Sequence, residues 1–368
     1  MEIIHLILGK ANPQRMNGVN KVVYQLATHQ KKQGRNVSIW GITKNLSRNF
    51  DEREFETRLY PASKNPFGVS VQLREAIKQK TGKNDVVFHL HGGWIPVYVS
   101  LSKLFNRYKI RFVLTGHGAY NSVAMQRSKW VKKVYYHLFE KKVLNRASKI
   151  HSIGQSEVDG LEQIYQINKN FLLPYGFELH TPAVHKQPNQ NAFTIGFVGR
   201  LDTWTKGLDL LIQAFNEFQN MDKNSTLWIV GDGPGKADLL KYIKENNVEN
   251  VVLWGSKFGD EKDDLISQMH VFVHPSRNEG LPASVLEASA MGVPVIVSKQ
   301  TNVAESVARF KAGTALASNT KEDLKEAFLQ LNQSKNKAMK TLSENARKMV
   351  SEEYSWDNLI SKYDTLYR

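Results

Sequence analysis

The chain has 368 residues, 41% of them hydrophobic, so it is long enough for two domains that each bury a core. It has no cysteine, which excludes disulfides, zinc–thiolate sites and thiol nucleophiles. Its 50 basic and 35 acidic residues give a net charge of +15, and its longest apolar runs are strand-sized, too short to span a membrane. The N-terminus lacks a basic region before its first apolar run, so we expect no secretory signal and a cytoplasmic protein.

The first half of the chain alternates short apolar runs with stretches of helical spacing. Val22, Val23, Leu26 and Ala27 recur at helical intervals between the first two runs, and this stretch ends near Gly34. Such alternation predicts βαβ units and an open, parallel α/β sheet. The expected strands are residues 3–8, 37–42, 86–90, 112–115 and 149–153.

Residues 103–149 are strongly basic, with twelve lysines or arginines against one acid, Glu140. One expected helix in this region sets a basic stripe beside an apolar one: Lys129, Lys132 and Lys133 beside Trp130, Tyr135, Leu138 and Phe139. Such a helix suits an anionic membrane surface. The same pattern is equally typical of an amphipathic helix that packs on its own domain. No nucleic-acid motif accompanies the charge, so we expect no nucleic-acid partner.

After residue 173 the sequence turns polar and loses its periodicity, around Pro182 and Pro188, which indicates a linker. A second α/β series follows, and the last stretch, residues 335–368, has the pattern of two polar helices. We therefore predict an N-terminal domain over residues 1–180 and a C-terminal domain over 181–350. Residues 351–368 form a final helix expected to pack back toward the N-terminal domain. The expected strands of the second series are residues 193–198, 226–230, 251–254, 271–273, 293–297 and 314–316.

In open parallel sheets ligands bind at the carboxyl ends of strands, and the most informative loop follows the expected strand 271–273. Pro282 stands where a helix can begin, so Glu279 falls in the loop before it and Glu287 in its body. The free amides of the first turn, around Leu281 and Ala283, then form an anion site of the kind that a diphosphate occupies. We expect this helix to end near Gly292, before Pro294.

The two glutamates also have plainer readings, a solvated cap for Glu279 and a surface charge for Glu287. The neighbours of Glu287 are almost all apolar, which indicates a buried helix. A buried carboxylate needs a partner, and sugar hydroxyls would serve as hydrogen-bond donors.

Other strand-end loops carry further candidates. Arg200 follows Gly199, and Lys206 opens the next helix, an arrangement that suits a diphosphate as well as an exposed basic pair. His117 stands between two glycines, and Gly18 would let a ligand approach the backbone.

Three further patterns carry less weight. Residues 231–236 lack the Walker spacing, so we interpret them as a tight turn in which Asp232 is not a base. His270 and His274 are spaced as a helical metal pair, but the run between them is typical of a strand. His89 and His91 alternate on another strand, and we expect no metal site.

Five motifs in the second half resemble those of the retaining enzymes of glycosyltransferase family 4 (glycosyl transferases group 1). They are Gly-Phe-Val-Gly-Arg-Leu at 196–201, Lys-Gly at 206–207, Val-Gly-Asp-Gly-Pro at 230–234, Pro-Ser-Arg-Asn-Glu-Gly-Leu-Pro at 275–282 and Glu-Ala-Ser-Ala-Met-Gly-Val-Pro-Val-Ile at 287–296. The resemblance covers nearly the whole chain. It implies the GT-B architecture, an α/β fold with two Rossmann-like domains facing a cleft.

The resemblance also implies roles for the candidates. Glu279 would contact the donor hexose, Glu287 the ribose hydroxyls, and Arg200 with Lys206 the diphosphate. Gly18 would lie near the phosphates and His117 near the donor sugar. The remaining donor contacts would come from Gly199, Gly280, Leu281, Pro282, Ala283 and Ser284, with a base pocket at Ser256, Lys257 and Phe258.

Two departures from the family pattern matter. The glycine pair usual in the first domain is Asn17-Gly18 here, which bears on the phosphate contacts. The stretch from Ser298 to Glu305 lacks the common glycines, which leaves open how residues 301–304 meet a donor.

The resemblance implies retaining transfer of a hexose from a UDP- or GDP-sugar, without a metal or other cofactor and without a protein nucleophile. The expected acceptor is a lipid-linked surface glycan at the cytoplasmic face of a membrane, because of the basic helix. The alternatives are transfer to a small soluble acceptor and a non-catalytic protein that binds a nucleotide-sugar.

Overall fold

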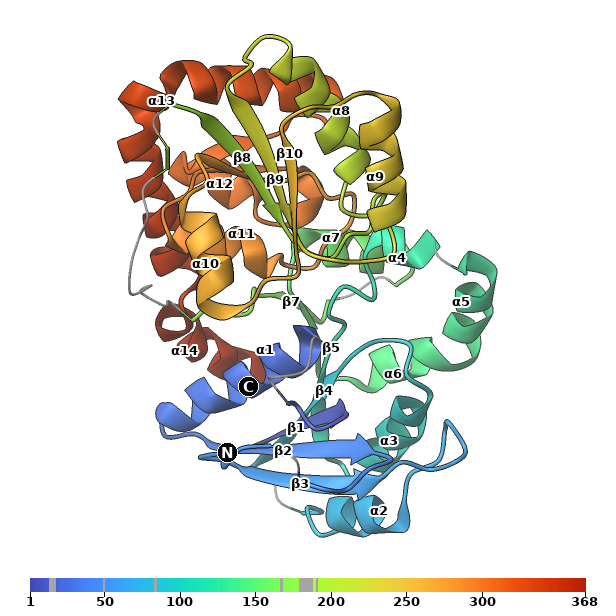
Figure 1. Cartoon of the computed structure of the whole chain (residues 1–368). Helices are drawn as coiled ribbons and strands as arrows, with labels where there is room; N and C mark the ends of the chain where they lie inside the picture. The colour runs from blue at the N-terminus through green and yellow to red at the C-terminus, as the bar shows by residue number, and fades with distance from the viewer. Residues whose placement is uncertain are drawn as a thin grey trace. The chain divides into compact units, whose positions relative to one another are not determined.

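The computed structural model describes residues 1–12, 18–48, 50–82, 85–126, 128–165, 168–178, 188–189 and 191–368, apart from the side chains of 335–337. It divides into two compact units (Figure 1). The first comprises Met1–Gly176 with Trp356–Arg368, and the second Phe177–Ser355. Each unit is a parallel sheet covered by helices, which confirms the predicted α/β class.

The first unit contains a seven-stranded sheet in the order β3-β2-β1-β4-β5-β6-β7. Every pairing in it is parallel. The strand order reverses at β1, which pairs with β2 on one side and β4 on the other. The strands are β1 (Glu2–Leu8), β2 (Asn36–Thr43), β3 (Glu56–Pro61), β4 (Val86–His91), β5 (Arg111–Thr115), β6 (Lys149–Ser152) and β7 (Asn170–Leu172).

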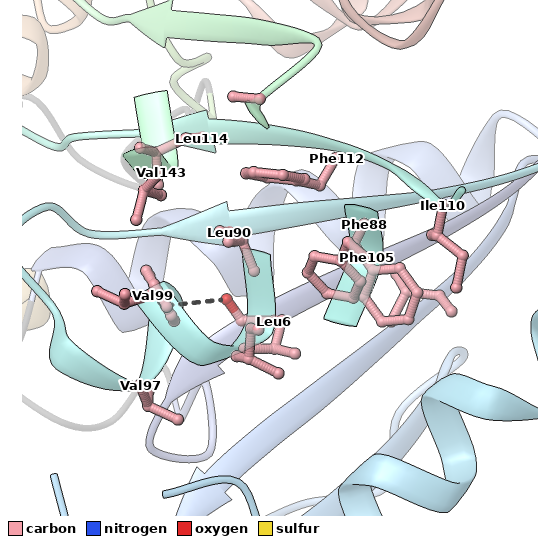
Figure 2. Close-up of a cluster of buried hydrophobic side chains, with 14 of the residues drawn as sticks. Leu6, Phe88, Leu90, Val97, Val99, Phe105, Ile110, Phe112, Leu114 and Val143 are labelled. Carbon is pink, nitrogen blue, oxygen red and sulfur yellow. Dashed lines mark hydrogen bonds between the residues drawn. The ribbon is translucent and has the colours of Figure 1, made fainter. Parts of the chain in front are cut away.

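Helices bury this sheet from both faces. On one face Phe88 of β4, Phe105 of α3 and Phe112 of β5 pack in a large apolar cluster, shown in Figure 2. On the other face α1 and α14 cover the sheet. The helices are α1 (Gly18–Lys32), α2 (Val71–Lys78), α3 (Pro96–Arg107), α4 (Ser122–Gln126), α5 (Lys129–Tyr135), the π-helical η1 (Tyr136–Glu140), α6 (Lys141–Arg146), α7 (Gln155–Glu162) and α14 (Trp356–Tyr367).

Helix α14 is the last element of the chain, yet it belongs to the first unit and packs beside α1 (Figure 1). Its buried residues Trp356, Tyr363 and Leu366 join the apolar cluster on that face of the sheet. Arg35 and Asp364 form an ion pair at 2.5 Å. The C-terminal end of the chain is therefore part of the core of the first unit.

The second unit contains a six-stranded parallel sheet in the order β10-β9-β8-β11-β12-β13. Its strands are β8 (Phe193–Val198), β9 (Ser225–Val230), β10 (Val251–Gly255), β11 (Val271–His274), β12 (Val295–Val297) and β13 (Gly313–Ala315). Its helices are α8 (Leu208–Gln219), α9 (Lys236–Glu245), α10 (Gly259–Ser267), α11 (Ala283–Ala290), the 3₁₀ helix η2 (Lys299–Thr301), α12 (Ala304–Phe310), α13 (Lys321–Met349) and the π-helical η3 (Val350–Tyr354).

The structure confirms the predicted strands to within about three residues and adds β3 and β7. These two strands were missed because β3 carries polar side chains and β7 has only three residues, none of them buried. The prediction of two helices over residues 335–368 is wrong at its start, since α13 already begins at Lys321. The predicted linker around Pro182 lies mostly outside the described residues.

None of the helices in the described ranges is both long enough and apolar enough to cross a bilayer.

We expect Leu366→Ala to destabilise the first unit by about 2 to 5 kcal/mol, because Leu366 is only 1% exposed and its loss leaves a cavity. Lys362 lies on the exposed side of the same helix, so Lys362→Ala is expected to change stability by less than about 0.5 kcal/mol. Urea denaturation of both variants measures the difference. Equal stability of the two variants would contradict the assignment of α14 to this core.

Candidate functional site

In the second unit, β8 and β11 are neighbours in the sheet, so the loops that follow them lie side by side. Three hydrogen bonds join these loops. The Ser276 hydroxyl and the Arg277 amide each donate to the Thr205 carbonyl at 2.8 Å, and the Arg277 guanidinium donates to the Trp204 carbonyl at 2.7 Å. Arg277 also forms a bidentate pair with Asp209 of α8 at 2.7 Å. These contacts fix the loop 199–207 against the loop 275–282.

A glycine sets the position of Lys206. Gly207 has a φ of +67°, and a Cβ at this position would lie 2.0 Å from the Pro275 carbonyl oxygen. Only glycine adopts this conformation and allows this approach without strain. The Lys-Gly sequence at 206–207 thus brings the chain against the loop after β11 immediately before α8 begins at Leu208.

Lys206 and Glu279, both predicted site residues, contact each other through Nζ and Oε1. Their side chains are mostly buried, with 19% and 16% exposed. Burial alone would raise the pKa of Glu279, but the hydrogen bond with His274 and the charge of Lys206 outweigh it and lower the pKa to about 2. Glu279 is therefore a carboxylate at neutral pH.

His274 is a site residue that the sequence analysis missed. Its Nε2 lies 3.0 Å from Glu279 Oε1, and its ring stacks on Phe197 at 5.4 Å between centroids. Burial lowers the pKa of His274, so the neutral ring donates its Nε2–H to the carboxylate. The sequence feature that could have identified His274 as a site residue is its position before Pro275, at the end of β11.

His270 and His274 do not form a metal pair, as the strand pattern between them predicted. His270 lies at the other end of β11, where its Nδ1 accepts a hydrogen bond from the Thr194 amide at 3.0 Å.

The segment after β12 holds the backbone of the Glu279 loop. The Asn302 side-chain amide donates to the carbonyls of Glu279 and Gly280 at 2.9 and 2.7 Å, and the Glu279 amide donates to the Gln300 carbonyl at 3.2 Å. Asn302 has a φ of +59°, a conformation in which asparagine is among the best-tolerated non-glycine residues. Thr301 is buried and bonds to the Ser298 carbonyl. Asn302 thus serves as a structural clamp in a stretch without the family's common glycines.

Helix α11 begins as predicted, with Pro282 at its N-cap and Ala283 as its first residue. Proline offers no side-chain acceptor, and the Pro282 carbonyl receives the amides of Val285 and Leu286. Leu281 is buried and has a partner of its own. Within the described ranges the amides of Ala283 and Ser284 have no acceptor, so the helix has an open end there.

Glu287 lies in the body of α11, as predicted, and its side chain is 14% exposed. The partner that its burial requires is Lys262 of α10, whose Nζ lies 2.8 Å from Glu287 Oε2. The partners expected from the sequence were sugar hydroxyls, and Lys262 was not predicted. This lysine stands among the acids of residues 260–264, so nothing local distinguishes it from a surface charge.

The structure does not bring Arg200 to the Lys206–Glu279 pair. Arg200 is exposed, and no hydrogen bond or ion pair to a described residue reaches its guanidinium. Gly199 lies against the turn at 231–235, where a Cβ on Gly231 would lie 1.9 Å from the Gly199 carbonyl oxygen. Asp232 pairs with Lys236 at 3.3 Å and not with a site residue.

The expected base pocket lies on the loop between β10 and α10. Lys257 pairs with Glu261 at 3.2 Å, and Phe258 is 63% exposed at the N-cap of α10. Both side chains are thus accessible on the loop at the carboxyl end of β10.

Two predicted site residues, His117 and Gly18, belong to the first unit. His117 has a φ of +53° in the loop after β5, and the adjacent Gly118 amide donates to the buried Glu157 carboxyl group. Burial raises the pKa of Glu157 to about 7. The Nε2 of His117 lies 3.0 Å from His91 Nδ1. Gly18 is the first residue of α1, and Asn17 lies outside the described residues.

Three buried histidines of the first unit, His5, His89 and His91, offer nitrogen atoms within 4.8 Å of one another, close enough to hold a metal ion. The absence of a metal site, expected from the sequence, stays a prediction.

Two family models match the chain in succession. The model described as Glycosyltransferase Family 4 matches residues 16–179, and the model described as Glycosyl transferases group 1 matches residues 183–349. Together they leave only the two ends and residues 180–182 unmatched.

Relatives and solved structures agree with these matches. The capsular polysaccharide biosynthesis glycosyltransferase CapM of Staphylococcus aureus is 28% identical over 61% of this chain and 58% of its own length. A GDP-mannose-dependent phosphatidylinositol monomannoside mannosyltransferase of Mycobacterium tuberculosis is 29% identical over 43% of each chain. The structure of Anabaena HepE with UDP and glucose superimposes with a TM-score of 0.72 at 17% identity, covering 100% of this chain and 99% of that one. The chain spans about half the length of the curated relatives it matches.

The two parallel α/β units and these structural neighbours define a GT-B fold, as predicted. The two successive matches show a glycosyltransferase family 4-like protein.

We expect Glu279→Gln to lower the free energy of unfolding at pH 7 by on the order of 3 kcal/mol. Because the folded pKa of Glu279 is lowered to about 2 from an ordinary value of 4.5, its stabilisation is fully present above pH 4.5 and is lost as pH falls toward 2. Urea denaturation over this pH range measures the difference between variant and wild type.

The matched control is Glu56→Gln, which removes an exposed ion pair with Arg58 and is expected to cost less than about 1 kcal/mol. A deficit of Glu279→Gln that stays constant down to pH 2 would contradict the lowered pKa.

Proposed function

We propose that the protein is a retaining glycosyltransferase that moves a hexose from a UDP- or GDP-sugar. The observation that carries this proposal is the contact between Lys206 and Glu279 at the strand ends of the second unit, in the same unit as the uncapped start of α11. A fixed cation, a fixed carboxylate and free helix amides are the groups that a sugar diphosphate requires.

The chemistry follows from where charge develops. Breaking the bond between a sugar and a diphosphate leaves negative charge on the nucleotide and positive character on the sugar ring. Lys206, Arg200 and the amides of Ala283 and Ser284 would stabilise the departing diphosphate, with Arg200 reorienting to reach it. Glu279, held as a carboxylate by its low pKa, would lie beside the sugar.

These protein cations would do without a divalent metal. The acceptor would attack from the face that the diphosphate leaves, with the leaving phosphate as its base, so no protein nucleophile is assigned. The family resemblance implies both features.

The remaining donor contacts are assigned by position. Glu287, with Lys262 as its partner in the free protein, would accept the ribose hydroxyls. The accessible Lys257 and Phe258 would border the base, and the backbone of Gly199, Gly280, Leu281 and Pro282 would line the diphosphate and sugar. For His117 and Gly18, which belong to the first unit, contacts with the sugar and the phosphates stay predictions that the family resemblance implies.

The comparisons support both bases. HepE was solved with UDP and glucose, and the mycobacterial relative is named as dependent on GDP-mannose. A nucleotide that binds the folded state raises its melting temperature, so the larger rise with UDP or with GDP identifies the base.

We expect Lys206→Ala to lower kcat/KM for sugar transfer by about 10² to 10³, because a cation aimed at the leaving group is removed. The assay uses UDP-glucose and GDP-mannose as donors. The control is Lys321→Ala, which removes an ion pair with Glu217 at the start of α13 and is expected to retain turnover. Near-normal turnover of Lys206→Ala, with circular dichroism showing an intact fold, would overturn the assignment.

We further propose that the acceptor is a lipid-linked surface glycan, reached from the cytoplasmic face of a membrane by peripheral binding. The support is helix α5 with the start of η1. Trp130, Val131, Val134 and Leu138 are 52 to 74% exposed, and Lys129 and Lys133 lie exposed among them. One relative is named for capsular polysaccharide biosynthesis, and another is named as a phosphatidylinositol monomannoside mannosyltransferase.

The residues of the predicted apolar stripe face two ways: Trp130 and Leu138 are exposed, whereas Tyr135 and Phe139 are not. Tyr135 and Phe139 turn inward, where Tyr135 contacts Trp94 and Phe139 contacts Phe67 at 6.1 and 4.9 Å between ring centroids. The sole acid of the basic region, Glu140, is buried and accepts hydrogen bonds from Tyr120 and the Trp94 amide. The outward side thus keeps its apolar and basic residues, the combination that an anionic bilayer binds.

We expect the protein to bind vesicles containing phosphatidylglycerol and not vesicles of phosphatidylcholine alone, with binding weakened by salt. Lys129→Ala with Lys133→Ala is expected to weaken binding about ten- to thirtyfold, at roughly 1 kcal/mol for each cation. Sedimentation with vesicles measures the affinity. The charge-matched control is Lys241→Ala with Lys348→Ala, which removes two exposed cations of the second unit. Binding indifferent to lipid charge would contradict the proposal.

A further inference from the structure

Five histidines of the first unit belong to one continuous chain of hydrogen bonds, which we call the histidine chain. It begins at His117 and ends at the backbone carbonyl of Leu173. In order, the contacts are His117 Nε2 to His91 Nδ1 (3.0 Å), His91 Nε2 to His5 Nδ1 (2.9 Å), His5 Nε2 to Gln30 Oε1 (2.7 Å), Gln30 Nε2 to Tyr367 OH (3.0 Å), Tyr367 OH to His89 Nδ1 (3.0 Å), His89 Nε2 to Thr115 Oγ1 (2.6 Å), Thr115 Oγ1 to His151 Nδ1 (2.7 Å) and His151 Nε2 to Leu173 O (2.7 Å).

The sheet brings these residues together. Strands β1, β4, β5 and β6 are successive neighbours, His5 lies opposite His89, and Thr115 lies opposite His151. Helices α1 and α14 cover this face and supply Gln30 and Tyr367. Four of the five histidines are buried, and His117, in the loop after β5, is partly exposed.

Burial keeps all five rings neutral at neutral pH. It lowers the pKa of His5 and His151 to about 4 and that of His117 to about 3, and it lowers the pKa of His89 and His91 well below the ordinary value. A neutral imidazole carries one N–H donor and one lone pair, so each ring donates on one side and accepts on the other.

The Leu173 carbonyl sets the direction of the chain because it can only accept. His151 must donate to it from Nε2, so His151 Nδ1 accepts from the Thr115 hydroxyl. Because the Thr115 hydroxyl uses its only proton in the bond to His151, it accepts a hydrogen bond from His89 Nε2–H. His89 Nδ1 then accepts from the Tyr367 hydroxyl.

The hydrogen bonds of the remaining half of the chain run in the same direction. The Tyr367 oxygen accepts from the Gln30 side-chain amide, which fixes the orientation of that amide and leaves Gln30 Oε1 to accept from His5 Nε2–H. His5 Nδ1 accepts from His91 Nε2–H, and His91 Nδ1 accepts from His117 Nε2–H. His117 Nδ1 therefore carries a lone pair, and it has no partner among the described residues.

If every hydrogen bond of the histidine chain ran in the opposite direction, each donor would still meet an acceptor except at the Leu173 end. Reversal would turn the Gln30 amide over and point the lone pair of His151 Nε2 at the lone pairs of the Leu173 carbonyl. A buried carbonyl and ring nitrogen would then both be unsatisfied, which disfavours the reversed chain by roughly tenfold or more. One backbone carbonyl thus selects the tautomer of a histidine eight hydrogen bonds away.

We propose that the histidine chain is a positioning relay that holds His117 in its Nε2–H tautomer, so that Nδ1 is presented as the hydrogen-bond acceptor for a hydroxyl of the sugar substrate. The identity of that hydroxyl rests on the proposed function, whereas the tautomer does not. Tyr367 and Thr115 act through His117 and are positioning residues.

The competing use of these residues is a metal site at His5, His89 and His91. All six ring nitrogens of these three residues already have hydrogen-bond partners, and a single set of neutral tautomers satisfies them all. A metal ion would have to displace bonds on every ring. The test therefore includes metal content as an outcome.

Imidazole tautomers are read from ¹⁵N chemical shifts of the histidine-labelled full-length protein, with His117 assigned by the loss of its signals in His117→Ala. Tyr367→Phe cuts the chain between Gln30 and His89, and Thr115→Val cuts it between His89 and His151. The matched control is Tyr363→Phe. Tyr363 lies on the same helix and is buried, but its hydroxyl donates to the Pro174 carbonyl at 3.3 Å, outside the chain.

We expect wild type and Tyr363→Phe to hold His117 at above roughly nine-tenths Nε2–H, and either cut to lower that fraction to about half, because the chain can then reverse. The kcat/KM for transfer should fall by the same factor as the Nε2–H fraction, about twofold. A purely structural role would lower the melting temperature and leave the tautomer unchanged.

Three results would overturn the relay. They are a mixed or Nδ1–H state of His117 in wild type, an unchanged Nε2–H fraction in both cut variants, and a stoichiometric bound metal with loss of the bridging N–H signals. Absence of transfer with every donor, together with the expected tautomers, would instead overturn the proposed function and leave the relay in place.

Discussion

The ion pair between Lys206 and Glu279 is the interaction on which the organisation of the second unit's strand ends depends. It joins residues 73 positions apart, in the loops after β8 and β11. A carboxylate with 16% exposure is tolerable only with a fixed counter-charge, and a lysine in that setting needs the carboxylate equally. Gly207, Arg277 and Asn302 hold the backbones so that the two charges meet. In the free protein Lys206 and Glu279 are therefore held in contact with each other. A ligand that carries negative charge can replace Glu279 as the partner of Lys206.

Local features of the chain could be predicted from the sequence, and features that depend on the assembled fold could not. The parallel strands were predicted because strands buried on both faces are continuous apolar runs, whereas the polar β3 and the short β7 give no such run. Glu279, Lys206 and the start of α11 at Ala283 were predicted because glycine, proline and charge mark strand-end loops locally. Their partners were not, since Lys262, His274 and Asn302 gain their roles only from elements brought together by the fold. The histidine chain could not be predicted for the same reason, because six strands and helices and two loops contribute to it.

The first unit places polar side chains where apolar ones would pack more simply. His5, His89 and His151 occupy interior strand positions, and each would be costly without partners. The network is complete from one end to the other, which is the condition under which a buried polar network specifies a single arrangement. Helix α14 contributes both Leu366 to the apolar cluster and Tyr367 to this network. The last turn of the chain thus determines stability and polar order in the same unit.

Burial, with or without a counter-charge, sets the charge state of the candidate site groups in both units. Burial without a counter-charge drives the histidines of the first unit neutral, so His117 offers a lone pair at neutral pH. Burial against Lys206 keeps Glu279 ionised, since its partner outweighs the loss of solvation. A neutral ring nitrogen can accept a hydrogen bond from a sugar hydroxyl, and a fixed cation suits a diphosphate that gains charge as it leaves. Because each state is set by burial and partner rather than by bulk pH, both persist together across the physiological pH range.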